Sequence, residues 1–270
     1  MKRSKRIRRP SAWNAWYWDV PLAALTLALA VWLLQANQSL FWAGHQLAAH
    51  GHATLWAYVT LCGDTLMVLT LCLPLVRVRP ELIWAGVLAG VLAAVAVQGL
   101  KHGLLVMRPS HVFPAGQLHL IGGPLRSSAA FPSGHAATIF TMIGVVILWM
   151  PADARRYWAP LLLTLALLVS LSRIVVGVHW PLDVLAGAAI GWLAAVLGSL
   201  WARRWRWGET AAGRTTLTLL LTACALTALI HYHSGYPQTD PGRRIIALLA
   251  LGLAGYQFCV ARWGAAAEQC

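Results

Sequence analysis

Charged residues are scarce in this sequence. Only 11% of its 270 residues are Asp, Glu, Lys or Arg, whereas 59% are hydrophobic. Runs such as LIWAGVLAGVLAAVAV (82–97) have no polar face, which the surface helices of a soluble domain would need. The composition therefore excludes an ordinary soluble domain and predicts an all-α fold, a polytopic transmembrane helical bundle.

Acidic residues and cysteines are also few. Eight Asp and Glu residues stand against 21 Lys and Arg residues, which gives a formal net charge of +13. The chain offers no carboxylate cluster suited to a divalent metal, so we expect no metal and no other cofactor. Four cysteines (Cys62, Cys72, Cys224 and Cys259) fall within expected spans and Cys270 is the last residue, so no disulfide or cysteine metal site is predicted.

Apolar stretches long enough to cross a membrane recur along the chain. They cover residues 20–36, 54–76, 82–100, 135–151, 159–176, 181–201, 215–231 and 245–261. We expect a basic cytoplasmic N-terminus (1–19) before an uncleaved first helix, a six-span core (20–207), and a C-terminal transmembrane hairpin and tail (208–270). The last two stretches are short for a span, which leaves re-entrant or interfacial placement open.

The distribution of positive charge predicts the orientation. With the N-terminus in the cytoplasm, only six of the 21 Lys and Arg residues fall outside: Lys101, Arg108, Arg126, Arg173, Arg243 and Arg244. We therefore expect a multi-pass protein of the cell inner membrane, and the net charge is explained by topology and by attraction to anionic headgroups. No nucleic-acid partner and no obligate protein partner is inferred.

The first polar cluster is KHGLLVMRP, which contains Lys101 and Arg108. Seven residues are two helical turns, so a third span that continues past Leu100 would project both cations from one face and end at Pro109. The alternative is a pair of cations that extend to the membrane interface without a ligand.

The second cluster is FPSGHAAT (131–138), at the start of an apolar stretch. Ser133 is suited to cap a helix that begins near His135, and the Gly134 and His135 N–H groups would then point outward from the positive end of the helix dipole. Such a helix N-terminus favours an anion, and a phosphate above all. An ordinary cap followed by an incidental histidine is the alternative.

The third cluster is SRIVVGVHWPLD, with Arg173, His179 and Asp183. Pro181 favours the first turn of the sixth span, which sets His179 at the mouth of this helix and Asp183 four residues later. A carboxylate in that place accepts the imidazole N–H and makes the other nitrogen a better nucleophile or base. A structural His–Asp pair is the alternative reading.

Together these three clusters resemble the signature of the type 2 phosphatidic acid phosphatase superfamily. That signature has a lysine followed by Arg-Pro, then Pro-Ser-Gly-His, then Ser-Arg with a later histidine and aspartate, and every position is filled here. The superfamily includes membrane lipid phosphate phosphatases, bacterial undecaprenyl pyrophosphate phosphatases, glucose-6-phosphatase and vanadium haloperoxidases. The motifs cover residues 100–185 and the six-span layout about 20–200, whereas the final hairpin is outside the usual pattern.

The resemblance implies a role for each signature residue. His179 would attack phosphorus and form a phosphohistidine, Asp183 would orient it, and His135 would protonate the leaving oxygen. The phosphate oxygens would be held by Lys101, Arg108, Ser133, Gly134 and Arg173.

Two features outside the signature have open interpretations. Asp64, in TLCGDTLMVL, is an acid within an expected span, so it either pairs with Lys101 or Arg108 or is a satisfied structural residue. The histidine pairs of HGH (50–52) and HYH (231–233) suggest zinc, but no cysteine or carboxylate accompanies them, so we disfavour a zinc site.

The resulting functional hypothesis is a metal-independent phosphatase that acts on a lipid phosphate or pyrophosphate at the outer face of the membrane. Undecaprenyl pyrophosphate is the substrate we favour, with phosphatidate, phosphatidylglycerol phosphate and lipid A phosphate as rivals. A phosphotransferase that delivers phosphate to a second lipid, such as lipid A, is one alternative. A lipid-phosphate transporter or binding protein is another, although it would not need the His179–Asp183 pair.

Overall fold

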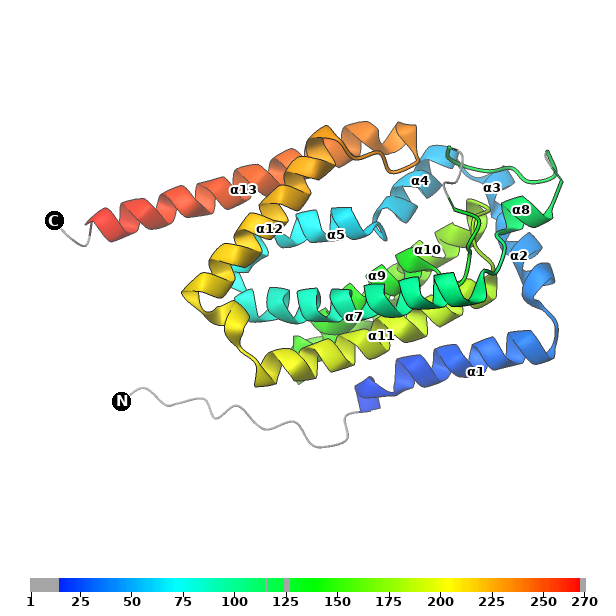
Figure 1. The fold of residues 1–270 in the computed structure, drawn as a ribbon, viewed down its shortest axis with the longest axis horizontal. Coiled ribbons are helices and arrows are strands. Elements are labelled where there is room, and N and C mark those ends of the chain that lie inside the picture. Colours follow the sequence, from blue (N-terminus) through cyan, green and yellow to red (C-terminus); the bar gives the residue numbers. More distant parts are fainter. Residues whose placement is uncertain (1–14, 115, 124–126, 268–270) are drawn as a thin grey trace.

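The fold is a bundle of α-helices that are mostly joined by short connections, with one longer connection between α8 and α9 (Figure 1). The computed structural model describes residues 15–114, 116–123 and 127–267. Its elements are η1 (Ala15–Tyr17), α1 (Asp19–Leu33), α2 (Asn37–His45), α3 (Leu47–His50), α4 (Ala53–Leu61), α5 (Thr65–Cys72), α6 (Leu75–Val78), α7 (Pro80–Leu104), α8 (Pro109–Val112), α9 (Gly134–Trp149), α10 (Ala152–Val175), α11 (Pro181–Arg204), η2 (Trp207–Glu209), α12 (Ala211–Ile230), η3 (Pro237–Thr239) and α13 (Asp240–Ala267).

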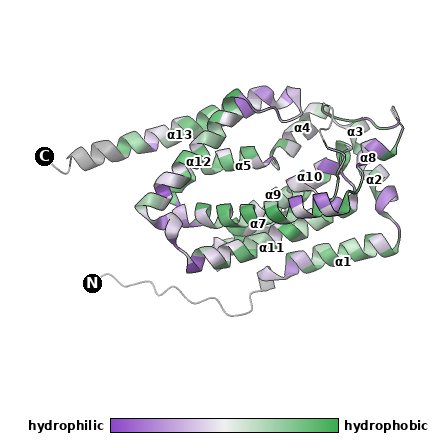
Figure 2. Cartoon of the chain, in the orientation of Figure 1, coloured by the Kyte–Doolittle hydropathy of each residue, from purple (hydrophilic) through white to green (hydrophobic). Residues whose placement is uncertain are grey.

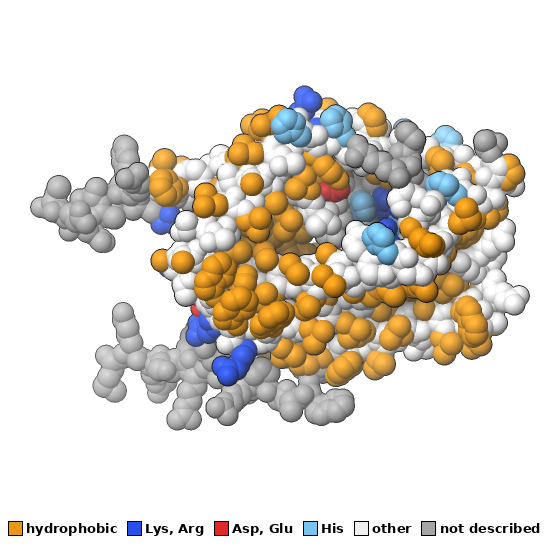
Figure 3. Space-filling model, in the orientation of Figure 1, with side chains coloured by type: hydrophobic (Ala, Val, Ile, Leu, Met, Phe, Trp, Pro, Cys, Tyr) orange, Lys and Arg blue, Asp and Glu red, His pale blue; other side chains and the backbone are white. Residues whose placement is uncertain are grey.

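The helices agree with the multi-pass membrane architecture expected from the sequence. Among the described residues, five helices are long and apolar enough to cross a membrane, and the number rises to seven if two bent helix pairs each form one span. Helix α9 is apolar but has only 16 residues. Hydrophobic residues predominate along the helices in Figure 2, and hydrophobic side chains cover much of the face in Figure 3.

Two expected spans differ in detail from the prediction. The stretch 54–76 is broken, because α4 and α5 meet at an angle of 59° around Gly63 and Asp64. Asp64 caps α5 by accepting a hydrogen bond from the Met67 N–H at 3.1 Å, a role that competes with a continuous helix. The chain after α1 turns by 107° into α2, a helix that the sequence interpretation did not include.

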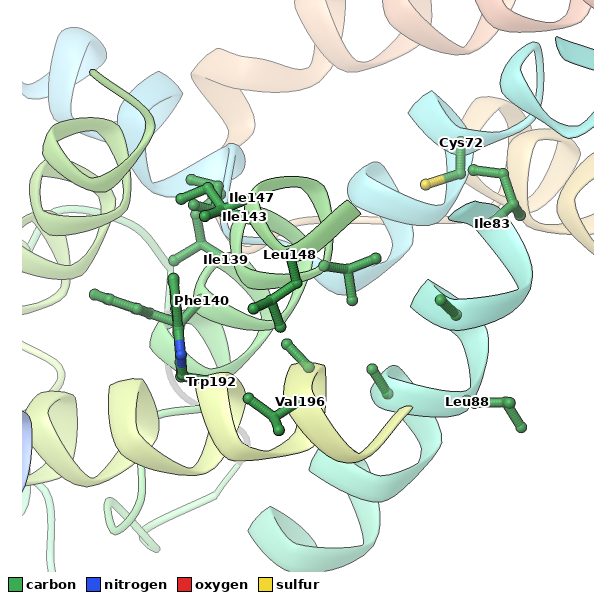
Figure 4. Packing of buried hydrophobic residues seen from close by; sticks show 14 of the residues in the cluster. Cys72, Ile83, Leu88, Ile139, Phe140, Ile143, Ile147, Leu148, Trp192 and Val196 are labelled. Atoms are coloured by element: carbon green, nitrogen blue, oxygen red, sulfur yellow. The ribbon is translucent and has the colours of Figure 1, made fainter. Parts of the chain in front are cut away.

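The core forms where α7, α9 and α11 pack together. Trp192 of α11 is fully buried and lies beside Phe140 of α9 (Figure 4). Small residues allow the close approach: a Cβ at Gly191 would lie 2.3 Å from the Ala137 carbonyl oxygen, and one at Gly198 would lie 2.5 Å from the Ala89 nitrogen. This packing fixes the start of α9 against the start of α11.

The C-terminal hairpin of α12 and α13 packs along α5 (Figure 1). Its connecting loop returns to the end of the bundle where α10 ends and α11 begins. The predicted N-terminal segment lies largely outside the described residues, as do Arg126 and Cys270 and the side chain of Arg262.

Candidate active site

His179 and Asp183 form a buried pair at the start of α11. The backbone turns at Gly177 (φ +84°), and Trp180 then occupies the N-cap position of the helix that Pro181 begins. His179 Nδ1 lies 3.2 Å from Asp183 Oδ2, and the same oxygen accepts the Trp180 N–H at 2.8 Å. His179 is 2% exposed and Asp183 is 1% exposed. The pairing expected from the four-residue spacing is present.

Ser133 caps α9 and connects it to the His179–Asp183 pair. Its hydroxyl accepts the Ala136 N–H at 3.5 Å, and its own N–H donates to the Asp183 carbonyl oxygen at 2.9 Å. Gly134 and His135 form the first turn of α9. Gly187 allows this contact, because a Cβ at that position would lie 2.5 Å from the Ser133 carbonyl oxygen. The N-terminus of α9 is therefore held against the first turn of α11, where Asp183 lies.

Lys101 and Arg108 reach the site by a different route from the one predicted. The expected continuous helix through both cations is wrong, because α7 ends at Leu104 and Leu105 adopts a left-handed conformation (φ +47°). The chain then forms a short antiparallel bridge between Met107 and Ala129, and Pro109 begins α8 instead of ending α7.

Arg108 is held against the histidine by backbone carbonyls. Its Nε donates to the Ser127 oxygen at 2.8 Å and its Nη1 to the Val178 oxygen at 3.0 Å. The same Nη1 lies 3.3 Å from His179 Nε2. The Arg108 side chain is buried, so the cation and the imidazole share a desolvated space.

Arg173 comes from the last turn of α10 and is 4% exposed. Its Nη1 donates to Thr60 Oγ1 at 2.5 Å and to the Tyr236 hydroxyl at 2.9 Å. Its Nε is buried and has no hydrogen-bond partner. A buried donor without an acceptor is costly, and a ligand oxygen would satisfy it.

The cations of the site act on both histidines. Lys101, Arg108 and Arg173 all exert a Coulombic effect on His135 and on His179. Burial, followed by the neighbouring Arg108 and Arg173 guanidinium groups, lowers the pKa of His179 well below its usual range. The structure thus brings together all the residues named from the three sequence clusters.

Asp64 does not have the role that would connect it to the cations. Besides capping α5, it accepts a hydrogen bond from the Tyr232 hydroxyl through Oδ2. Neither bond involves Lys101 or Arg108, so the suggested pairing is wrong and the reading of Asp64 as a satisfied structural residue is correct. Within the part of the chain that the structure describes, no three His, Cys, Asp or Glu residues form a group able to hold a metal ion.

Thr60 and Tyr236 are the site neighbours that the sequence interpretation missed. Both contact Arg173, although neither belongs to a signature motif. The available signal was the loop HYHSGYPQTD, which the charge-derived topology assigns to the same membrane side as the three clusters.

An apolar groove opens beside the start of α9. It is lined by α5, α7 and α9, from Gly134 and Gln98 near the polar site to Leu82 and Val146 farther along the helices. Gly86 and Gly90 of α7 line it with open space beside them. Figure 3 shows a hollow on this face, with hydrophobic side chains around it and histidine and Lys or Arg side chains toward one end. The polar site and the groove share Gly134.

The fold and the polar site together define a multi-pass helical membrane protein with a buried cluster of cations and histidines at one end of its bundle. Residues 81–207 match the model of the PAP2 superfamily, so the chain contains a PAP2 superfamily domain. The matched region includes every signature residue and ends before the C-terminal hairpin.

Relatives and a solved structure agree with this family. The chain is 36% identical over 111 residues to an undecaprenyl-diphosphatase of Sulfolobus acidocaldarius, which is 40% of this chain and 50% of the relative. It is 32% identical over 108 residues to a lipid A 1-phosphatase of Rhizobium etli, or 38% and 44% of the two chains. The matches span from 44% to 50% of the lengths of these two curated relatives. The crystal structure of Aquifex aeolicus LpxE is similar with a TM-score of 0.53 and 28% identity, and covers 61% of this chain and 94% of that one.

Proposed function

We propose that this protein is a phosphatase that hydrolyses a lipid phosphate or diphosphate through a phosphohistidine intermediate. The observation that carries the proposal is the buried contact of His179 Nε2 with Arg108 Nη1, at 3.3 Å, while Nδ1 faces Asp183. When the Nδ1–H group donates a hydrogen bond to the Asp183 carboxylate, Nε2 has a free lone pair, which is directed at a cation-lined space.

The proposed reaction has two steps. His179 Nε2 attacks phosphorus as the bond to the leaving oxygen breaks, and His135 donates a proton to that oxygen. Water then attacks the phosphohistidine, His135 takes a proton from the water, and inorganic phosphate leaves with His179 restored. Asp183 holds the His179 tautomer and stabilises the charge that the imidazole acquires.

The phosphate oxygens would be bound by the groups that surround His179. Lys101, Arg108 and Arg173 supply positive charge, and the unpartnered Arg173 Nε supplies a directed donor. The Ser133 hydroxyl and the Gly134 N–H complete the set at the N-terminus of α9. These fixed donors stabilise charge on the transferred phosphoryl group and fill the role that a metal ion has in other phosphatases.

The apolar groove supports a lipid as the substrate. A phosphate bound at the α9 terminus would have its hydrocarbon chain beside the groove of α5, α7 and α9. Undecaprenyl diphosphate is the substrate we favour, since it has a long apolar chain and since one relative is named for it. The name of the second relative makes the lipid A 1-phosphate the main rival.

We further propose that the site faces the periplasm from the inner membrane. Arg155 and Arg156 lie at the start of α10 and Arg203 and Arg204 at the end of α11, in both cases at the opposite helix end from the site. Each helix has 24 residues, about 36 Å at 1.5 Å per residue, which is enough to span a bilayer. The positive-inside rule then assigns these four arginines to the cytoplasm.

Phosphate release from defined lipids tests the proposal. The purified protein in lipid vesicles would be given undecaprenyl diphosphate, a lipid A 1-phosphate or phosphatidate, with His179→Ala as the control. We expect free phosphate from the wild type only, with the highest kcat/KM for undecaprenyl diphosphate. Transfer of the phosphate group to a second lipid, without release of free phosphate, would indicate a phosphotransferase. No turnover of any lipid would contradict the proposal.

A further inference from the structure

The C-terminal hairpin lies outside the matched superfamily region and yet contacts the candidate active site. The matched region ends at residue 207, and Tyr236 lies in the loop between α12 and α13. Its hydroxyl accepts a hydrogen bond from Arg173 Nη1 at 2.9 Å. The Tyr236 side chain is 6% exposed, so this contact is inside the protein.

The loop that presents Tyr236 is fixed by its own hydrogen bonds. Thr239, which is fully buried, donates from its hydroxyl to the Tyr236 carbonyl oxygen at 2.8 Å. The Ser234 hydroxyl accepts the Tyr236 N–H at 3.2 Å. Arg243 of α13 is 1% exposed, donates to the Ala228 carbonyl oxygen of α12, and so joins the two helices below the loop. These contacts specify one position for the tyrosine.

The Tyr236 side chain shares a buried cluster with the segment that joins Arg173 to His179. It belongs to a buried hydrophobic cluster with Val175, Val176 and Val178, and with Ile121, which lies in the connection between α8 and α9. Gly123 donates its N–H to the Gly235 carbonyl oxygen at 2.7 Å, which attaches that connection to the hairpin. The hairpin therefore contacts both the cation and the chain that leads to the nucleophile.

We infer that Tyr236 is a positioning residue, through which the C-terminal hairpin orients the Arg173 guanidinium toward the phosphate. The inference rests on the proposed function. Arg173 Nη1 is oriented by the Tyr236 and Thr60 oxygens, and this leaves Nε for a phosphate oxygen. A planar guanidinium binds phosphate well only when its plane is set, so removal of one acceptor weakens binding without removal of the cation.

Tyr236→Phe tests this inference in the full-length protein, because it removes only the hydroxyl. We expect kcat/KM for farnesyl phosphate to fall by about ten-fold and the Ki of orthovanadate to rise by a similar factor, as for the loss of one charge-assisted hydrogen bond. A merely structural role would reduce the fraction of active enzyme, which lowers kcat but leaves the Ki unchanged. Tyr256→Phe is the matched control, since that tyrosine lies on α13 and is 67% exposed.

A double-mutant cycle with Arg173→Lys provides the second readout. If Tyr236 acts through the guanidinium, Tyr236→Phe should have little further effect in the Arg173→Lys background. An unchanged vanadate Ki in Tyr236→Phe, or an equal loss in both backgrounds, would overturn the inference. If Tyr236→Phe yields no folded protein, Thr239→Val takes its place. That substitution keeps the Tyr236 hydroxyl but removes the hydrogen bond from the Thr239 hydroxyl to the Tyr236 carbonyl oxygen, which fixes the loop. A folded Thr239→Val with normal kcat/KM and Ki would likewise overturn it.

Vanadate binding also separates this inference from the proposed function. The rise in thermal unfolding temperature with orthovanadate measures binding without turnover. If the wild type binds vanadate but releases phosphate from no lipid, the proposed function fails, and weaker vanadate binding by Tyr236→Phe than by Tyr256→Phe still supports the inference.

Discussion

Arg108 Nη1 lies 3.3 Å from His179 Nε2, the nitrogen that points away from Asp183. The contact places a permanent cation against the proposed nucleophile. A cation there disfavours protonation of the imidazole and also attracts a phosphate to it. One arginine would thereby help burial to keep the proposed nucleophile neutral and would also attract the proposed phosphate.

The pH dependence of the enzyme should reflect this contact. Because burial and the two arginines lower the pKa of His179, its imidazole stays neutral as the pH falls through 6.5, the usual value. The acid limb of kcat/KM should therefore lie below that pH. Arg108→Gln removes one cation, so the pKa of His179 should rise and the acid limb should move to higher pH.

A comparison of the two pH profiles with the same substrate checks this prediction. The ionisation of the substrate contributes equally to both profiles and cancels in the comparison. If the limb stays in place although Arg108→Gln has lost activity, Arg108 binds phosphate without an effect on the histidine.

The apolar groove predicts a difference between lipid and aryl substrates. Gly90→Leu would place a side chain in the open space that lines the groove. Displacement of about two methylenes of a lipid chain, each worth ~0.8 kcal/mol, should raise KM for a prenyl diphosphate by about ten-fold. KM for p-nitrophenyl phosphate should not change, because that substrate has no chain.

Gly99→Leu is the matched control for the groove. It lies on the same helix, also has open space around it, and does not line the groove. If Gly99→Leu and Gly90→Leu raise KM equally, the effect comes from the helix and not from a tail site.

Close packing of α9 on α11 should be necessary for activity. In Gly187→Ala the new methyl would lie 2.5 Å from the Ser133 carbonyl oxygen, so the two helices must separate. We expect a loss of ~1–3 kcal/mol in stability, as for other overpacked sites. The N-terminus of α9, which we propose binds the phosphate, should also move away from His179. We therefore expect a lower kcat/KM in the protein that remains folded.

Gly252→Ala on α13 provides the comparison, since a Cβ there meets nothing within 4 Å. It should keep wild-type activity and gain slightly in helix propensity. Thermal unfolding and kcat/KM measured on both variants test the prediction, and equal behaviour of the two would show that the close contact is not required.

The sequence predicted the helix caps and the His179–Asp183 pair better than the path of the chain. Pro181 with Asp183 and the Ser133 cap are local patterns, and the structure has both where they were expected. The break at Gly63 and the end of α7 at Leu104 were missed. At each place the hydropathy of the flanking residues indicates a continuing helix, whereas the structure ends the helix there. The contact between Tyr236 and Arg173 joins residues 63 positions apart, and only tertiary packing determines it.

Activity should not depend on an added divalent metal. Three cations and a helix N-terminus surround the proposed phosphate position, and they supply the charge stabilisation for which other phosphatases use magnesium. Phosphate release should therefore persist in EDTA at the wild-type rate. Loss of activity in EDTA followed by recovery with magnesium would contradict the proposed mechanism.

The two histidines should differ in how their loss depends on the leaving group. Every substrate needs the nucleophile, so His179→Ala should abolish turnover of lipid and aryl phosphates alike, together with the phosphoenzyme. If His135 acts as the acid, its importance should increase with the need of the leaving oxygen for a proton. A lipid alkoxide leaves poorly, so His135→Ala should slow hydrolysis of a lipid monophosphate by ~10²–10⁴-fold. Turnover of p-nitrophenyl phosphate should fall much less.

Rapid quench with labelled substrate measures both quantities, the rate and the phosphoenzyme. His135→Ala should still form the phosphoenzyme from p-nitrophenyl phosphate, because nitrophenolate needs no proton to leave. Equal losses of His135→Ala on both substrates would mean that His135 binds phosphate or shapes the site instead of acting as the acid. A phosphoenzyme that survives in His179→Ala would mean that the nucleophile is another residue, and His135, which the same three cations affect, would be the first to test.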